Sequence, residues 1–202
     1  MFRQTPKHLD VLTIKRQARV PYHGLGFLKC MLDGDIYKDL LNHFNVNARR
    51  FQCEQVDDYL HTTHPSMSPS LMYEDPVFNS YLSSALKPAH EAWCGFPLVE
   101  ASCYGIRVYQ RGSYLYSHVD TITTHVISAS ICIDAQLDKP WPFYIEDIKG
   151  VPHELSLLPG EMIFYESAKL KHARPYPLEG DYYAAIFVHY TPVGWPVTYP
   201  DC

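Results

Sequence analysis

Two histidines and an aspartate in this sequence have the types and the spacing of a metal site. His118 and Asp120 lie two residues apart in an extended stretch, and His172 follows much later in the chain. Side chains of a strand alternate between its two faces, so His118 and Asp120 are expected on one face, where both can bind one ion. Two histidines and one carboxylate form the facial triad that holds Fe(II) and leaves other coordination positions open. His172 is the candidate third ligand.

The composition of the chain limits the classes of function to consider. The 202 residues suit one compact domain with a proper core. Seventeen basic and twenty-two acidic residues give a formal net charge of −5, without a run of five like charges. This argues against nucleic acid and a polybasic membrane patch as partners. No apolar stretch resembles a signal peptide or a membrane span, so we expect a cytoplasmic protein.

The first half of the sequence predicts helices and a long loop. Residues 11–14 alternate like a strand, and an aspartate cap begins a helix over 33–44. A second, shorter helix is expected over 52–60. The Pro- and Ser-rich segment 61–76 is either a lid or binding loop or a plain connection. Asp-Pro then begins a helix over 75–93, which a glycine and a proline end. These helices are expected to buttress a sheet.

The second half of the sequence has the texture of a β-sandwich, with short apolar runs separated by turn residues. The predicted strands cover 99–110, 114–120, 125–134, 143–145, 153–158, 162–166 and 182–190. We therefore expect a mainly β protein with N-terminal helices and a double-stranded β-helix core, the jelly roll of the cupins. Residues 1–97 would buttress the catalytic core, 98–202, within one domain. In such a core, ligands from non-neighbouring strands meet at one mouth.

Three segments carry a family resemblance. They are Tyr109–Asp120, Leu158–Tyr165 with its Pro-Gly turn, and His172. Their order is the one found in the prolyl 4-hydroxylase branch of the Fe(II)/2-oxoglutarate-dependent oxygenases. The region 99–195 resembles the catalytic domain of that branch. The resemblance implies Fe(II) on the triad, chelated by 2-oxoglutarate, with O2 at the remaining position. It implies succinate, CO2 and a hydroxylated substrate as products, and leaves ascorbate open as a reductant.

One position departs from the family pattern. The family anchors the far (C5) carboxylate of 2-oxoglutarate with a Lys or Arg nine or ten residues after the distal histidine, where this chain has Asp181 and Tyr182. An aspartate there would repel the cosubstrate. Arg174 is the expected replacement, since it lies two residues after that histidine and its planar fork matches a carboxylate. Arg107 is the second choice, and Tyr109 would give the cosubstrate a hydroxyl hydrogen bond, as the matching family tyrosine does.

Several other chemically capable residues are expected to be structural. His125 follows Asp120 at an odd offset, so an ideal strand would point it to the opposite face. His153 and His189 are interpreted as structural. Packing is the expected role of the aromatic side chains Trp141, Phe143, Phe164, Tyr165 and Trp195.

The cysteines indicate a reducing environment. All six are scattered and form no Cys-x-x-Cys pair, so reduced thiols are expected, with a chance disulfide as the alternative. Cys132 lies between two isoleucines and is expected to be a small buried side chain. Ser128 and Ser130 share its strand face, which would point inward and leave room for a cosubstrate.

The leading functional hypothesis is hydroxylation of an unactivated C–H bond on a prolyl residue of a peptide or protein. A free amino acid or another small metabolite is the alternative substrate. A cupin-like metal-binding module without catalysis is an alternative from another class, supported by the absent family anchor. A purely structural jelly roll would explain none of the spacing. The substrate, the regiochemistry and the oligomeric state stay open.

Overall fold

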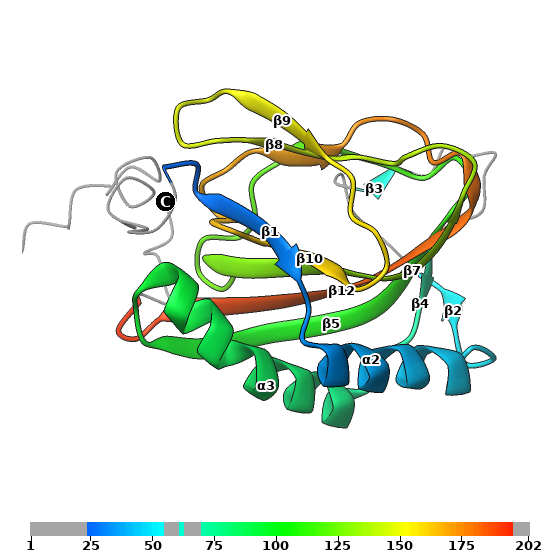
Figure 1. Ribbon diagram of the computed structural model, residues 1–202, viewed down its shortest axis with the longest axis horizontal. Helices are drawn as coiled ribbons and strands as arrows, with labels where there is room; N and C mark the ends of the chain where they lie inside the picture. The colour runs from blue at the N-terminus through cyan, green and yellow to red at the C-terminus, as the bar shows by residue number, and fades with distance from the viewer. Residues whose placement is uncertain (1–23, 55–60, 63–69, 196–202) are drawn as a thin grey trace, which may run out of the picture.

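The computed structural model describes residues 24–54, 61–62 and 70–195, which form two antiparallel sheets and two helices (Figure 1). The larger sheet has the strand order β1-β10-β7-β12-β5-β4-β2, and the smaller one β3-β6-β11-β8-β9. The strands of the larger sheet are β1 (Phe27–Met31), β2 (Gln52–Cys53), β4 (Leu71–Met72), β5 (Leu98–Gln110), β7 (Ile127–Leu137), β10 (Glu161–Tyr165) and β12 (Gly180–Pro192). The strands of the smaller sheet are β3 (His61–Thr62), β6 (Tyr114–His118), β8 (Phe143–Glu146), β9 (Pro152–Leu155) and β11 (His172–Arg174).

The two helices begin at aspartate caps, as the sequence predicts. The Asp33 carboxylate accepts hydrogen bonds from two backbone N–H groups of the first turn of α2 (Gly34–Val46), and Asp75 does the same for α3 (Pro76–Cys94). Gly95 ends α3 in the left-handed conformation, with a φ of 75°, which costs a glycine little. Among the described helices, none is long and apolar enough to cross a membrane.

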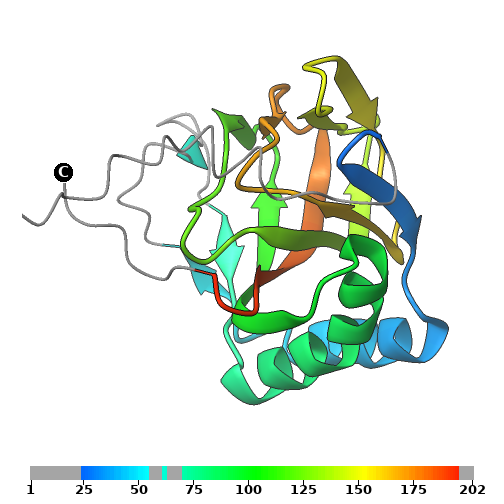
Figure 2. The same ribbon diagram turned by 90° about the vertical axis from the view of Figure 1, so that its left-hand side faces the viewer.

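The helices cover one face of the larger sheet, and the smaller sheet covers the other (Figures 1 and 2). Leu40, Leu82 and Leu86 of the helices are buried in one core cluster with residues of β5, β7 and β12. A second cluster contains buried side chains of both sheets, such as Ile145 of β8 and Ile163 of β10, and fills the sandwich next to the site described below. The mainly β double-stranded β-helix with N-terminal helices is therefore confirmed.

The N-terminal half contributes more strands than the sequence predicts. β1 pairs with β10, so residues 27–31 belong to the larger sheet. Residues 52–53 form a strand rather than the start of a helix, and 55–60 lie outside the described residues. The predicted loop 61–76 contains β3 and β4, while 63–69 and the predicted strand 11–14 are likewise outside. Such two-residue strands carry too little pattern to be recognised. The division into 1–97 and 98–202 stays a prediction.

The five cysteines in the described part of the chain are free thiols, and Cys202 lies outside it. Cys132 is fully buried, as expected. Burial raises the pKa of its thiol to about 11, so the reactive thiolate is suppressed.

Candidate metal centre

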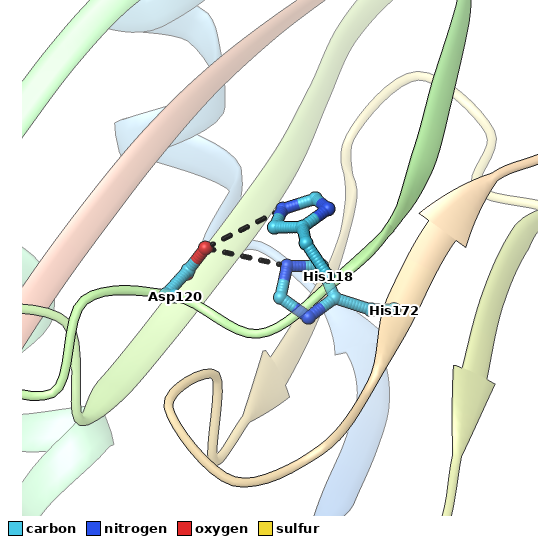
Figure 3. A group of neighbouring side chains, drawn as sticks. All are labelled: His118, Asp120 and His172. Atoms are coloured by element: carbon cyan, nitrogen blue, oxygen red, sulfur yellow. Dashed lines mark ion pairs between the residues drawn. The ribbon is translucent and has the colours of Figure 1, made fainter. Parts of the chain in front are cut away.

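The pairing of β6 with β11 brings the two candidate histidines together. His118 and His172 are register partners in this antiparallel pair, and their ring centroids are 4.3 Å apart. Asp120 lies just beyond the end of β6, where its backbone N–H donates to the Ser167 carbonyl at 2.9 Å. The Asp120 carboxylate points toward the two imidazole rings (Figure 3). Residues far apart in sequence therefore converge on one point.

The three side chains present their ligand atoms to one another. Asp120 Oδ1 is 3.5 Å from Nε2 of His118 and 3.5 Å from Nε2 of His172 (Figure 3), and all three ligand atoms lie within 4.8 Å of one another. The side chain of His172 is only 4% exposed, and those of His118 and Asp120 are 11% and 15% exposed. The group is therefore mostly shielded from water but still reachable.

Backbone carbonyls fix the orientation of both imidazoles. His118 Nδ1 lies 2.8 Å from the Tyr116 carbonyl, and His172 Nδ1 lies 2.9 Å from the Leu170 carbonyl. A carbonyl can only accept, so each Nδ1 carries a proton, and Nε2, the nitrogen that each ring turns toward Asp120, is the one available to a metal. Although burial opposes ionisation, the neighbouring His172 and His118 hold the pKa of Asp120 well below its usual range. The aspartate is therefore a carboxylate at neutral pH.

This donor set fits a divalent transition metal. Donor atoms about 2.1 Å from an ion and at right angles to each other are separated by about 3 Å. The 3.5 Å separations therefore require only a small inward movement of the side chains. Two imidazoles and one carboxylate on a single face are the donors of non-haem Fe(II) sites.

The triad lies in the wall of a cavity of about 330 Å³ between the two sheets. The residues singled out from the sequence, Tyr109, Arg107 and Arg174, also line this cavity. Ser130 lines it as well, which agrees with the expectation that its strand face points inward. Phe143 and Tyr165, expected to pack, form part of the same wall. The structure thus brings all six candidate residues to one site.

Arg174 is a buried cation at this cavity. Arg174 is only 4% exposed, and its guanidinium carbon lies 4.3 Å from the ring centroids of both Trp141 and Tyr183. Its Nη1 donates to the Trp141 carbonyl. Among the described residues, no carboxylate forms an ion pair with Arg174. The aromatic rings compensate part of its charge, and an anion in the cavity would complete the compensation.

Arg107, in contrast, already has a counterion. Its guanidinium forms a buried ion pair with Glu54, and its Nη1 lies 3.4 Å from the Tyr109 hydroxyl. Because Glu54 neutralises Arg107, Arg174 is the better receptor for a further carboxylate.

The residues at the family's usual anchor position point away from the cavity. Asp181 is exposed and pairs with Arg111 at 3.5 Å. Tyr182 donates to the Asp134 carboxylate and packs against the helix-side core cluster. The repulsion expected from Asp181 is therefore absent, because its carboxylate lies on the surface.

Two further histidines, His125 and His189, also line the cavity. The prediction that His125 faces away is wrong, because a turn precedes it: its N–H donates to the Thr121 carbonyl at 2.8 Å, and strand alternation does not apply. His189 is buried, and its ring centroid lies 3.8 Å from that of His125. Burial, followed by the neighbouring His125, holds the pKa of His189 well below its usual range. The turn before His125 cannot be recognised by assuming strand alternation, and nothing local to His189 indicates that its strand face meets the cavity.

His153 lies elsewhere, paired with Asp147 at 3.2 Å and in edge contact with Phe27. This agrees with the expected structural role.

Sequence comparison finds no relatives: no family model matches the chain, and no curated protein matches it. Solved structures do match. One is a prolyl hydroxylase from Trichoplax adhaerens in complex with a hypoxia inducible factor oxygen degradation domain peptide fragment, with a TM-score of 0.65 at 11% identity over 89% of this chain and 91% of that one.

Two other matching structures contain a metal. EctD from S. alaskensis with bound Fe has a TM-score of 0.62 at 15% identity, over 92% of this chain and 79% of that one. HygX from Streptomyces hygroscopicus, with nickel, 2-oxoglutarate and hygromycin B bound, has a TM-score of 0.58 at 15% identity over 84% of both chains. The chain therefore has the jelly-roll fold of the Fe(II)/2-oxoglutarate-dependent oxygenases, prolyl hydroxylases among them, with a His-Asp-His group facing its cavity.

Proposed function

We propose that this protein is an Fe(II)/2-oxoglutarate-dependent dioxygenase that hydroxylates an unactivated C–H bond. The observation that carries the proposal is a facial triad sharing one cavity with a buried arginine that has no carboxylate partner in the described part of the chain. The triad alone would suit many metal-binding modules. A buried cation beside it calls for an anionic ligand, and 2-oxoglutarate is a dianion.

Each residue has a defined part in this function. His118, Asp120 and His172 would hold the iron, with both imidazoles kept in the ligating tautomer by backbone carbonyls. Arg174 would bind the C5 carboxylate of 2-oxoglutarate through its fork. Iron and 2-oxoglutarate, when bound, would supply the activation of O2, with succinate and CO2 as co-products. The aromatic wall would exclude bulk water.

The charges at the cavity favour an uncharged substrate group. Arg107 is balanced by Glu54. The charges of Fe(II), a 2-oxoglutarate dianion, Asp120 and Arg174 also cancel. A free carboxylate or ammonium group entering the filled cavity would therefore lack a counterion, which is costly in a buried site. A residue linked by peptide bonds carries neither charge.

We therefore favour a prolyl residue of a peptide or protein as the substrate. One structural neighbour was solved with a peptide fragment, which supports this class. Another was solved with hygromycin B, so a small metabolite is the second candidate. The two classes are separated by screening succinate formation and a mass increase of one oxygen atom against proline-containing peptides, free amino acids and no substrate.

The decisive experiment is anaerobic addition of Fe(II) and 2-oxoglutarate to the folded protein. A visible charge-transfer band is expected from the chelated metal, and its absence would contradict the proposal. His118→Ala should lose the band and succinate formation. His153→Ala, a matched histidine outside the cavity, should keep both. Metal binding without a band, unaffected by 2-oxoglutarate, would instead indicate a non-catalytic metal-binding module.

A further inference from the structure

His189 is a polar residue of the cavity to which the proposed chemistry gives no role. It lies on β12 with 2% of its surface exposed, and its ring centroid is 3.8 Å from that of His125 and 5.7 Å from that of Tyr104. It is also close enough to Asp120 to interact with that carboxylate electrostatically. An imidazole so completely buried requires hydrogen-bond partners for both ring nitrogens.

A chain of hydrogen bonds fixes which ring nitrogen carries the proton. His189 Nδ1 lies 2.7 Å from Ser128 Oγ, which lies 2.6 Å from Ser167 Oγ. Ser167 Oγ lies 2.7 Å from the His125 carbonyl. That carbonyl can only accept, so the single hydroxyl proton of Ser167 is donated to it. Ser167 must then accept from Ser128, and Ser128 must accept from His189 Nδ1–H.

The proton order leaves His189 with a free lone pair. In this neutral tautomer Nε2 carries no proton and can only accept a hydrogen bond. Nε2 is buried and has no hydrogen-bond partner among the described residues. Leaving a buried acceptor unpaired is costly, and a donor from a bound ligand would remove that cost. The Ser167 carbonyl also accepts the Asp120 backbone N–H. Ser167 therefore contacts both a proposed metal ligand and the hydrogen-bond chain that ends at His189.

We propose that His189 Nε2 is an acceptor subsite of the metal cavity, which receives an O–H or N–H donor from a bound ligand. The donor is either a water molecule on the metal or a group of the substrate. The tautomer stands on the hydrogen-bond chain alone, whereas the identity of the donor rests on the proposed function. His189 is a positioning residue in this proposal, since it would orient the metal-bound water or the substrate group that donates to it.

The tautomer is tested first, without any metal. Long-range ¹H–¹⁵N correlation spectra of the full chain should show His189 protonated at Nδ1 and unprotonated at Nε2. A ring protonated at Nε2, or at both nitrogens, would overturn the proposal. Ser167→Ala should weaken this preference by removing the terminal donor of the chain. His153→Ala should leave the His189 signals unchanged.

The donor is tested by loading the protein with ¹¹³Cd(II). Scalar coupling to cadmium is expected at His118 and His172 but not at His189, whose Nε2 resonance should instead move in the direction of an accepted hydrogen bond. Movement with cadmium alone identifies metal-bound water as the donor. Movement only after addition of a proline-containing peptide identifies the substrate. No movement in either arm, or cadmium coupling at His189, refutes the subsite. Absent coupling at His118 and His172 would refute the proposed metal site while leaving the tautomer result intact.

Turnover provides an independent measurement once a substrate is identified. His189→Leu removes the acceptor and should lower kcat/KM at least tenfold, whereas His189→Gln, whose amide oxygen accepts, should recover most of it. Equal losses in both variants, measured on proteins with equal metal content, would show that the ring only fills space.

Discussion

Arg174 offers the sharpest test of how the cosubstrate is bound, because the structure gives its charge no counterion in the described part of the chain. Arg174→Met keeps the unbranched stem against Trp141 and Tyr183 but removes the fork. Removing one partner of a buried charge pair costs about 3 to 5 kcal/mol. At about 1.4 kcal/mol for each tenfold change, a loss of about 3 kcal/mol weakens 2-oxoglutarate binding roughly 150-fold.

This loss can be measured as ligand-induced stabilisation, with Zn(II) in place of iron so that no turnover occurs. At a 2-oxoglutarate concentration 100 times the wild-type Kd, the free energy of unfolding should rise by about 2.7 kcal/mol. The same concentration is below the Kd of the variant, so its gain should be only about 0.3 kcal/mol. Without ligand, the variant should be at least as stable as the wild type, because a buried cation that no described carboxylate neutralises has been removed.

The control is Arg107→Met combined with Glu54→Gln, which removes the neighbouring ion pair as a unit. Its 2-oxoglutarate affinity should change less than about fivefold, since that pair is balanced without a ligand. The reasoning fails if the control loses as much affinity as Arg174→Met, or if Arg174→Met binds 2-oxoglutarate normally.

Three further predictions concern the metal, the pH dependence and the fold. His118→Ala should lower Fe(II) affinity at least 100-fold by equilibrium dialysis, whereas an unchanged affinity would exclude His118 as a ligand. Burial raises the pKa of Glu166 to about 7, so the folded state binds the carboxyl proton of Glu166 more tightly than the unfolded state does. The free energy of unfolding should therefore fall by about 3 kcal/mol as the pH rises from 4.5 to 8. Glu166→Gln should remove that part of the slope in urea titrations, and equal slopes would disprove the assignment. Gly180 has a φ of 146°, and a Cβ there would lie 2.4 Å from the Gln136 carbonyl oxygen. Gly180→Ala should therefore lower the free energy of unfolding, measured with denaturant, by about 2 to 4 kcal/mol. A decrease below about 0.5 kcal/mol would contradict this prediction.

The sequence alone was sufficient wherever the signal is local. A helix cap needs one carboxylate next to free backbone N–H groups, so Asp33 and Asp75 could be recognised from their neighbours. The same holds for Gly95, whose conformation ends α3. The candidate metal ligands could be recognised because two of them are two residues apart and the third follows in the order of the family that the sequence resembles.

Other parts of the fold were not accessible from the sequence. The short strands β2, β3 and β4 are stabilised by pairing with strands distant in the chain, and two residues carry no alternation of their own. β1 likewise depends on β10, which is more than a hundred residues away. These strands form only because their partner strands lie next to them in the folded protein.

The cavity shows most clearly which features the sequence predicts and which depend on the tertiary structure. The sequence marked Arg174 and Arg107 as candidate anchors, but only the structure shows that Glu54 neutralises one and that no described carboxylate neutralises the other. It also shows Asp181 on the surface and His189 inside. Local patterns determine which side chains a strand can present. Strand register, a turn before a strand and the burial of counterions determine what those side chains meet, and these depend on contacts that exist only in the tertiary structure.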